Sequence, residues 1–151
     1  MQDDRPLFNQ LNIVTDDVDA ALAFYRRLGL DVPDGVRLPD GTRHAEVKLP
    51  GGVTLEFDNP ALARIYNAAW RCPGGSSPAL IGFSLPSREA VDRCYADLVA
   101  AGYEGRQIPY DAFWGARYAV VADPAGNDVG LMSPIEEARR SWPPVDSPTG
   151  G

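Results

Sequence analysis

Few side chains in this sequence commonly bind metal ions or act as nucleophiles. The chain has one histidine, His44, and two cysteines, Cys72 and Cys94, which lie 22 positions apart. A structural zinc site needs four ligands, usually supplied by closely spaced cysteines and histidines, and no such spacing is present. A Cys/His zinc site is therefore excluded.

Aromatic side chains gather just before a predicted strand that starts at Arg117, at positions Tyr110, Phe113 and Trp114. Such rings can stack on a planar ligand or face a cationic one, and they are also common in cores and subunit contacts. Arg117 could position an acidic ligand group, pair with a carboxylate, or be a surface charge. All four residues are candidate ligand-binding residues.

Composition and charge limit the possible partners. The chain has 151 residues, of which 44% are hydrophobic, as expected for a folded domain. Its net charge of −7 disfavours nucleic acid, because phosphates are repelled, and favours cations. No apolar run approaches the roughly 20 residues that cross a bilayer, and the first residues do not resemble a secretory signal. We therefore expect a cytoplasmic protein without a membrane partner.

The predicted elements occur twice in the same order. Apolar periodicity and turn residues predict strand, helix and three strands at 7–14, 17–28, 32–38, 43–49 and 53–58, then again at 79–85, 87–101, 103–108, 117–122 and 127–132. The helix caps Asp17 and Ser87 are 70 positions apart, and the turn glycines Gly52 and Gly126 are 74 apart. This spacing indicates two tandem modules.

The remaining segments are a connection and a tail. We assign one domain to residues 1–134, with module one at 7–58, a linker with a short helix at 59–77, and module two at 78–134. Residues 135–151 are rich in proline and glycine towards their end and are predicted to be a mobile tail.

Two segments resemble a known family. Residues 17–31, Asp-Val-Asp-Ala-Ala-Leu-Ala-Phe-Tyr-Arg-Arg-Leu-Gly-Leu-Asp, resemble the first helix of the glyoxalase/bleomycin-resistance/dioxygenase proteins, the vicinal oxygen chelate superfamily. Residues 113–118 and 123–127 resemble the strands that close its second module. The resemblance covers about residues 7–134. It implies an α+β fold of two tandem βαβββ modules, forming a cupped eight-stranded mixed sheet, and a homodimer. It also places Trp70 in the linker bordering the cavity.

The resemblance implies four metal-ligand positions, one on the first and one on the last strand of each module. They are Gln10 and Glu56 in module one, and Leu80 and Gly130 in module two. Leu80 and Gly130 cannot coordinate, and one carboxylate with one amide binds a divalent ion weakly. His44 falls on a middle strand and is predicted not to be a ligand. We therefore expect no cofactor and no tightly bound metal; any metal would use Gln10 and Glu56.

The sequence is compatible with two functions. The first is a small-molecule-binding protein similar to the bleomycin-resistance group, which sequesters a ligand without a metal. The alternative is a lyase, isomerase or dioxygenase that depends on a metal or uses Glu56 as its catalytic acid–base group. Equally, Glu56 could be a carboxylate paired with Gln10 or Arg117. The candidate ligand-binding residues are Gln10, Trp70, Tyr110, Phe113, Trp114 and Arg117.

Overall fold

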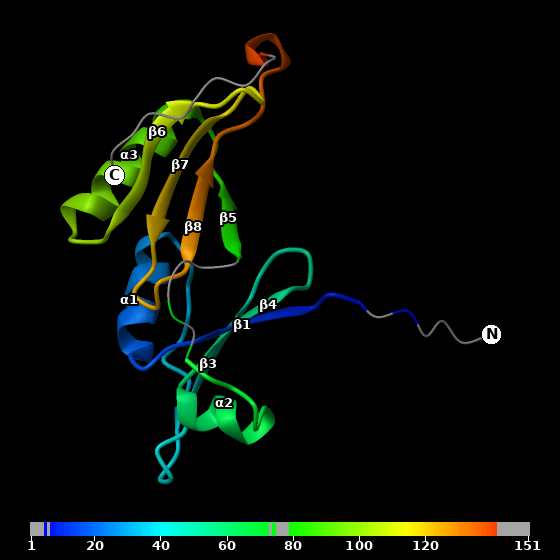
Figure 1. The fold of residues 1–151 in the computed structure, drawn as a ribbon, viewed down its shortest axis with the longest axis vertical. Helices are drawn as coiled ribbons and strands as arrows, with labels where there is room; N and C mark the ends of the chain where they lie inside the picture. Colours follow the sequence, from blue (N-terminus) through cyan, green and yellow to red (C-terminus); the bar gives the residue numbers. More distant parts are fainter. Residues whose placement is uncertain (1–4, 6, 73, 75–78, 142–151) are drawn as a thin grey trace. The chain divides into compact units, whose positions relative to one another are not determined.

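The computed structural model describes residues 5, 7–72, 74 and 79–141, and it divides the chain into two units, residues 1–73 and 74–151 (Figure 1). The first unit contains β1 (Gln10–Val14), α1 (Val18–Arg27), β2 (Val36–Arg37), β3 (Arg43–Lys48), β4 (Thr54–Asp58) and α2 (Pro60–Tyr66). The second contains β5 (Leu80–Ser84), α3 (Arg88–Ala100), β6 (Gly105–Asp111), β7 (Arg117–Ala122), β8 (Asp128–Met132) and the 3-10 helix η1 (Glu137–Arg139).

Each unit folds its strands into one mixed sheet with the same topology. The strand order is β1-β4-β3-β2 in module one and β5-β8-β7-β6 in module two. The first strand of each module runs parallel to the last, and the other neighbours are antiparallel. The predicted α+β fold of two tandem βαβββ modules is confirmed, with the strands in two four-stranded sheets.

The strand predicted at 32–38 is wrong in its length, since β2 contains two residues, Val36 and Arg37. Pro33 lacks the N–H group that a strand ladder uses, and Gly35 adopts a φ of 73°, which a regular strand does not contain. Pairing with β3 therefore begins after these residues.

The principal helices begin where the sequence predicts. The side chains of Asp17 and Ser87 accept hydrogen bonds from the backbone N–H groups of Ala20 and Ala90, which satisfies donors that the first helical turn leaves free. In module one, α1 buries Leu22 and Tyr25 completely, and the Tyr25 ring lies 5.2 Å from that of Phe57 in β4. The core of module one thus lies between α1 and one face of its sheet.

The residues after β8 are attached to the loop before β7. The backbone N–H of Glu136 donates to the carbonyl of Gly115, and that of Ser141 donates to the carbonyl of Phe113. The first part of the predicted tail therefore makes defined contacts in module two. The remainder, residues 142–151, lies outside the described residues, and its mobility stays a prediction.

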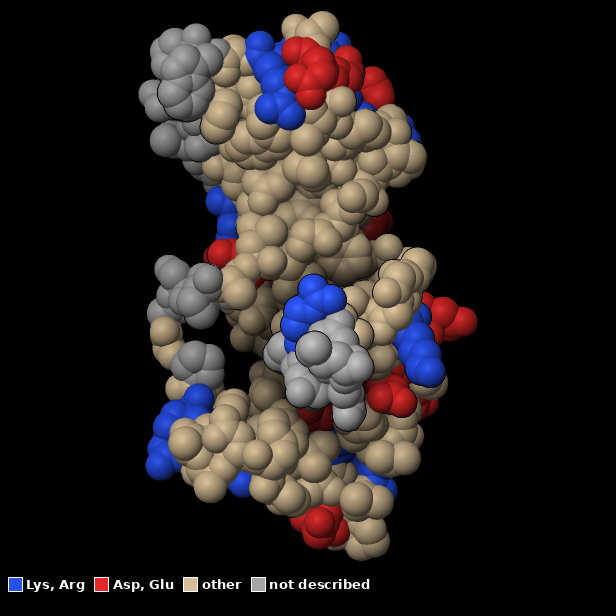
Figure 2. Space-filling view, turned by 90° about the vertical axis from the view of Figure 1, so that its right-hand side faces the viewer, with Lys and Arg blue, Asp and Glu red and all other residues tan. Residues whose placement is uncertain are grey.

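The net negative charge is not gathered into one region of the face seen in Figure 2. Acidic and basic side chains lie next to each other at several places on that face. Arg88 and Asp111 form one of the ion pairs in module two. Among the helices that the structure describes, none is long and apolar enough to cross a membrane.

Candidate polar site in module one

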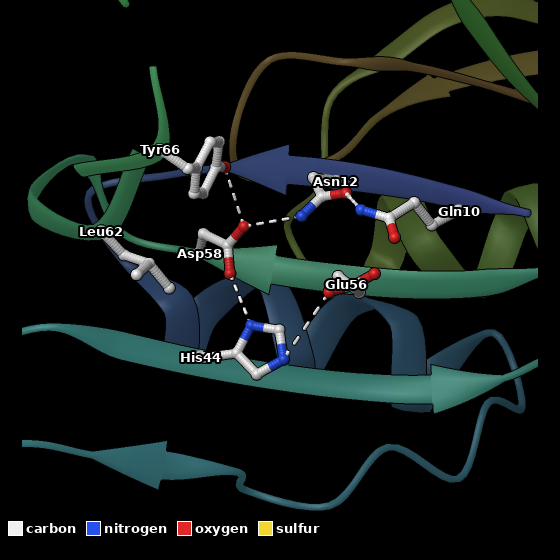
Figure 3. Close-up of a pocket in the computed structure, with 7 residues that line it drawn as sticks. All are labelled: Gln10, Asn12, His44, Glu56, Asp58, Leu62 and Tyr66. Carbon is white, nitrogen blue, oxygen red and sulfur yellow. Dashed lines mark hydrogen bonds and ion pairs between the residues drawn. The ribbon is translucent and has the colours of Figure 1, made fainter. Parts of the chain in front are cut away.

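A cavity of about 540 Å³ lies in module one, on the sheet face opposite α1 (Figure 3). Small-molecule sites commonly occupy roughly 300–1,000 Å³, so its size suits a metabolite or drug. Residues from β1, β3, β4 and α2 line it: Gln10, Asn12, His44, Glu56, Asp58, Leu62 and Tyr66.

Strand register explains why polar side chains meet there. Asn12 pairs with Glu56 across β1 and β4, while Glu46 pairs with Glu56 and His44 with Asp58 across β3 and β4. Side chains two positions apart in a strand share a face. His44 and Glu46 of β3 therefore lie beside Asp58 and Glu56 of β4, whereas Phe57 points into the core.

Asp58 is the centre of the hydrogen-bond network in this cavity. Asp58 is 1% exposed. Its Oδ2 accepts hydrogen bonds from Asn12 Nδ2 at 2.8 Å and from the Tyr66 hydroxyl at 2.9 Å. Its Oδ1 lies 2.6 Å from His44 Nδ1. A buried carboxylate is tolerated when hydrogen bonds replace its water, and these three partners do so.

One further contact extends this network to Gln10, and the hydrogen bond to Asp58 changes the pKa of Tyr66. Gln10 Nε2 donates to Asn12 Oδ1 at 2.9 Å, so the amides of β1 form a chain that leads to Asp58. Burial and the hydrogen bond to Asp58 raise the pKa of Tyr66 to about 12. Tyr66 therefore remains a hydroxyl donor at neutral pH.

The contact with Asp58 directs the other nitrogen of His44 towards two carboxylates. His44 Nε2 lies 3.6 Å from Glu46 Oε2 and 3.7 Å from Glu56 Oε1. Burial lowers the pKa of His44, but the hydrogen bond and charge of Asp58, helped by Glu46 and Glu56, outweigh it and raise the pKa. Burial raises the pKa of Glu56, partly offset by His44. At these distances a protonated His44 forms ion pairs with both glutamates.

The sequence predicted part of this site. Gln10 and Glu56 do lie in one cavity, but Gln10 donates to Asn12, and the ionic neighbours of Glu56 are on β3. Arg117, an alternative partner for Glu56, instead forms ion pairs with Asp92 at 2.8 Å and Asp111 at 3.2 Å within module two. Asp58 and Tyr66 were not anticipated, and His44 occupies a central place that the sequence did not suggest.

The predicted aromatic cluster forms in module two. Trp114 packs edge-to-face with Phe113 and Tyr118, with ring centroids 5.3 Å apart in each pair, and with Tyr110 at 6.5 Å. A cavity of about 300 Å³ adjoins Phe113 and Trp114. In module one, the Arg64 guanidinium carbon lies 5.2 Å from the Trp70 ring centroid. Ligand contact at any of these residues stays a prediction.

The strand registers also give the module-two counterparts of the polar site. The pair Asn12–Glu56 corresponds to Gly82–Gly130, and the pair His44–Asp58 corresponds to Tyr118–Met132. Gln10 corresponds to Leu80, as the sequence spacing indicates. Polar groups of module one are thus replaced by apolar or aromatic residues in module two.

These counterparts do not fit the four-ligand metal position that the family resemblance implies. Leu80 and Gly130 carry no ligand atom in their side chains. A Cβ added at Gly130 would lie 2.7 Å from the Tyr118 hydroxyl oxygen and 2.8 Å from Leu80 Cδ2. The space that a ligand side chain would need at position 130 is therefore occupied.

Comparisons with known proteins agree with the fold. The family model for the Glyoxalase/Bleomycin resistance protein/Dioxygenase superfamily matches residues 7–131. An uncharacterized protein of Mycobacterium tuberculosis is 32% identical over 129 residues, which cover 83% of this chain and 74% of that protein. A glyoxalase/bleomycin resistance protein/dioxygenase from Nocardioides has a TM-score of 0.68 at 27% identity, covering 89% of this chain and 87% of its own. A glyoxalase/bleomycin resistance protein/dioxygenase family enzyme from Burkholderia phytofirmans has a TM-score of 0.70 at 25% identity. The match covers 83% of this chain and 97% of that enzyme.

Proposed function

Because the chain belongs to the glyoxalase/bleomycin resistance protein/dioxygenase superfamily, we propose that it binds a small organic molecule in the module-one cavity. We further propose that it does so without a resident metal at the superfamily's four-ligand position. The observation that carries this proposal is the buried Asp58 network. It holds Asn12, His44 and Tyr66 in fixed orientations around a cavity of ligand size.

The chemistry of the lining indicates the class of ligand. Glu56 and Asp58 supply two carboxylates, Gln10 and Asn12 supply amides, and none of the seven lining residues is Lys or Arg. Hydrogen-bond acceptors and negative charge therefore dominate, and Leu62 adds an apolar wall. This set suits a small molecule with hydrogen-bond donors or a positive charge, and the net charge of −7 favours its approach.

Other residues are secondary candidates for ligand contact. The aromatic cluster of Tyr110, Phe113 and Trp114 offers ring faces and edges for a planar or cationic group. Trp70 and Arg117 already contact charged neighbours of their own modules. We propose a homodimer as the assembly, from the family resemblance alone.

A thermal-shift screen tests the binding site. The probes are polyamines, quaternary ammonium compounds and cationic antibiotics, with anionic analogues as the comparison set. A compound at 100 times its Kd stabilises the native state by about 2.7 kcal/mol, so binding raises Tm. We expect cationic hits whose affinity falls at least about tenfold in Glu56→Gln and Tyr66→Phe, because each variant removes one polar contact of about 1.4 kcal/mol.

Trp114→Ala is the control, since Trp114 belongs to module two. Binding retained in Trp114→Ala and weakened in the two module-one variants supports the proposal. Hits that survive both module-one variants but disappear in Trp114→Ala would move the site to the aromatic cluster. A set of anionic hits would contradict the proposed ligand class.

Catalysis on the bound molecule is the second candidate function. The observation that favours it is the position of Glu56 and His44 Nε2, 3.7 Å apart in one cavity. Mass spectrometry of a confirmed ligand after incubation with the protein distinguishes the two functions. Product that forms with the wild type and not with Glu56→Gln identifies an enzyme, whereas an unchanged ligand identifies a binding protein.

A further inference from the structure

We propose that His44, Glu46 and Glu56 form a binding site for a divalent transition-metal ion, which shares Glu56 with the superfamily's four-ligand position but takes its other two ligands from β3. One ligand atom from each residue lies within 4.8 Å of the other two. All three residues belong to neighbouring strands of module one. The site therefore needs nothing from module two, whose corresponding positions lack ligand atoms.

The spacing is close to what coordination requires. Ligand atoms about 2.0–2.2 Å from an ion are roughly 3–3.5 Å apart in octahedral or tetrahedral geometry. Nε2 of His44 is 3.6 Å from Glu46 and 3.7 Å from Glu56, and all three ligand atoms lie within 4.8 Å of one another, so rotations of the glutamate side chains would bring them to coordination distances. The Glu46 side chain is 56% exposed and is free to make that adjustment.

The orientation of His44 is an independent observation that supports its role as a metal ligand. Metal-binding histidines usually donate their second ring N–H to a carboxylate, which fixes the ring and the nitrogen that meets the ion. Asp58 occupies that place at 2.6 Å from Nδ1. Asn12 and Tyr66 hold Asp58 on its other oxygen. Nε2 is thereby left as the ligand atom, between the two glutamates.

The donor set defines the kind of ion. One imidazole nitrogen and two carboxylate oxygens suit Zn²⁺, Mn²⁺, Co²⁺, Ni²⁺ or Fe²⁺ and leave coordination positions for water. Three ligands, one of them on an exposed side chain, favour an exchangeable ion over a resident one. The site is compatible with the proposed absence of a resident metal at the four-ligand position, and it does not depend on an organic ligand.

Titration of chelator-treated, dialysed protein with Co²⁺ and Zn²⁺ tests this site. We expect one ion per chain by calorimetry and a visible Co²⁺ absorption spectrum that reports its coordination. Glu46→Gln should weaken binding at least about tenfold, and His44→Gln similarly, because each removes one of three ligands. Asp31→Asn removes an exposed charge of module one and should bind like the wild type.

Gln10→Ala separates the proposed site from the superfamily's position. Gln10 is outside the proposed ligand set, so its removal should change the affinity less than about threefold. A loss of binding in Gln10→Ala with normal binding in Glu46→Gln would place the ion at the superfamily's position and overturn the proposal. Wild-type affinity no better than that of Glu46→Gln would also overturn it. Circular dichroism checks that each variant is folded. The titrations contain no organic ligand, so a failure of the metal site can be distinguished from a failure of the small-molecule site tested by the thermal-shift screen.

Discussion

Replacing Asp58 with Ala is expected to lower the free energy of unfolding by roughly 3 kcal/mol. The substitution leaves Asn12 Nδ2, the Tyr66 hydroxyl and His44 Nδ1 without their acceptor. Each hydrogen bond to a charged acceptor contributes about 1.5–3 kcal/mol, and the contributions within one network do not add fully. The cavity left by a side chain that is 1% exposed contributes further.

Urea denaturation of the wild type and of Asp58→Ala measures this loss. Asp16→Ala is the matched control, because Asp16 is an exposed aspartate of module one. Its free energy of unfolding should lie within about 0.5 kcal/mol of the wild type. Equal stability of the two variants would mean that Asp58 does not organise a buried network.

Gly35→Ala is the second substitution expected to have a large effect, about 3 kcal/mol. Gly35 has a φ of 73° and approaches β3 so closely that a Cβ would overlap the His44 carbonyl oxygen and lie 2.6 Å from Ala45 Cα. The left-handed conformation costs an L-residue about 1–2 kcal/mol, and overpacking typically adds 1–3 kcal/mol. The clash is with backbone, so it should also displace His44.

Gly41→Ala separates the two contributions. Gly41 has a φ of 90°, but a Cβ there would have nothing within 4 Å. We expect a cost of about 1–2 kcal/mol from the backbone conformation alone. If urea denaturation gives the same loss for Gly35→Ala and Gly41→Ala, the close approach of Gly35 to β3 is not a determinant of stability.

Local sequence signals were sufficient for most of the fold. The caps Asp17 and Ser87 and the periodic apolar residues of α1 and α3 depend on neighbours in the chain, so they are readable from sequence. The extent of β2 was not readable in the same way. Its apolar alternation suggested a longer strand, but Pro33 and Gly35 prevent regular pairing.

The polar site was harder to predict because it depends on pairing between strands. The alternating pairs His44–Glu46 and Glu56–Asp58 each indicate a shared face, and that signal was available in the sequence. Their mutual register requires the geometry of the β3–β4 hairpin. Tyr66 could not be predicted, because its contact with Asp58 depends on how α2 packs beside the sheet.

Asp58 orients His44 so that Nε2 faces the module-one cavity. The chain contains one histidine, so long-range ¹H–¹⁵N NMR of the imidazole gives signals from His44 alone. Above the pH at which the ring loses its second proton, we predict the Nδ1–H tautomer, with that proton donated to Asp58. An Nε2–H tautomer, or the tautomer mixture of an exposed histidine, would show that Asp58 does not orient His44.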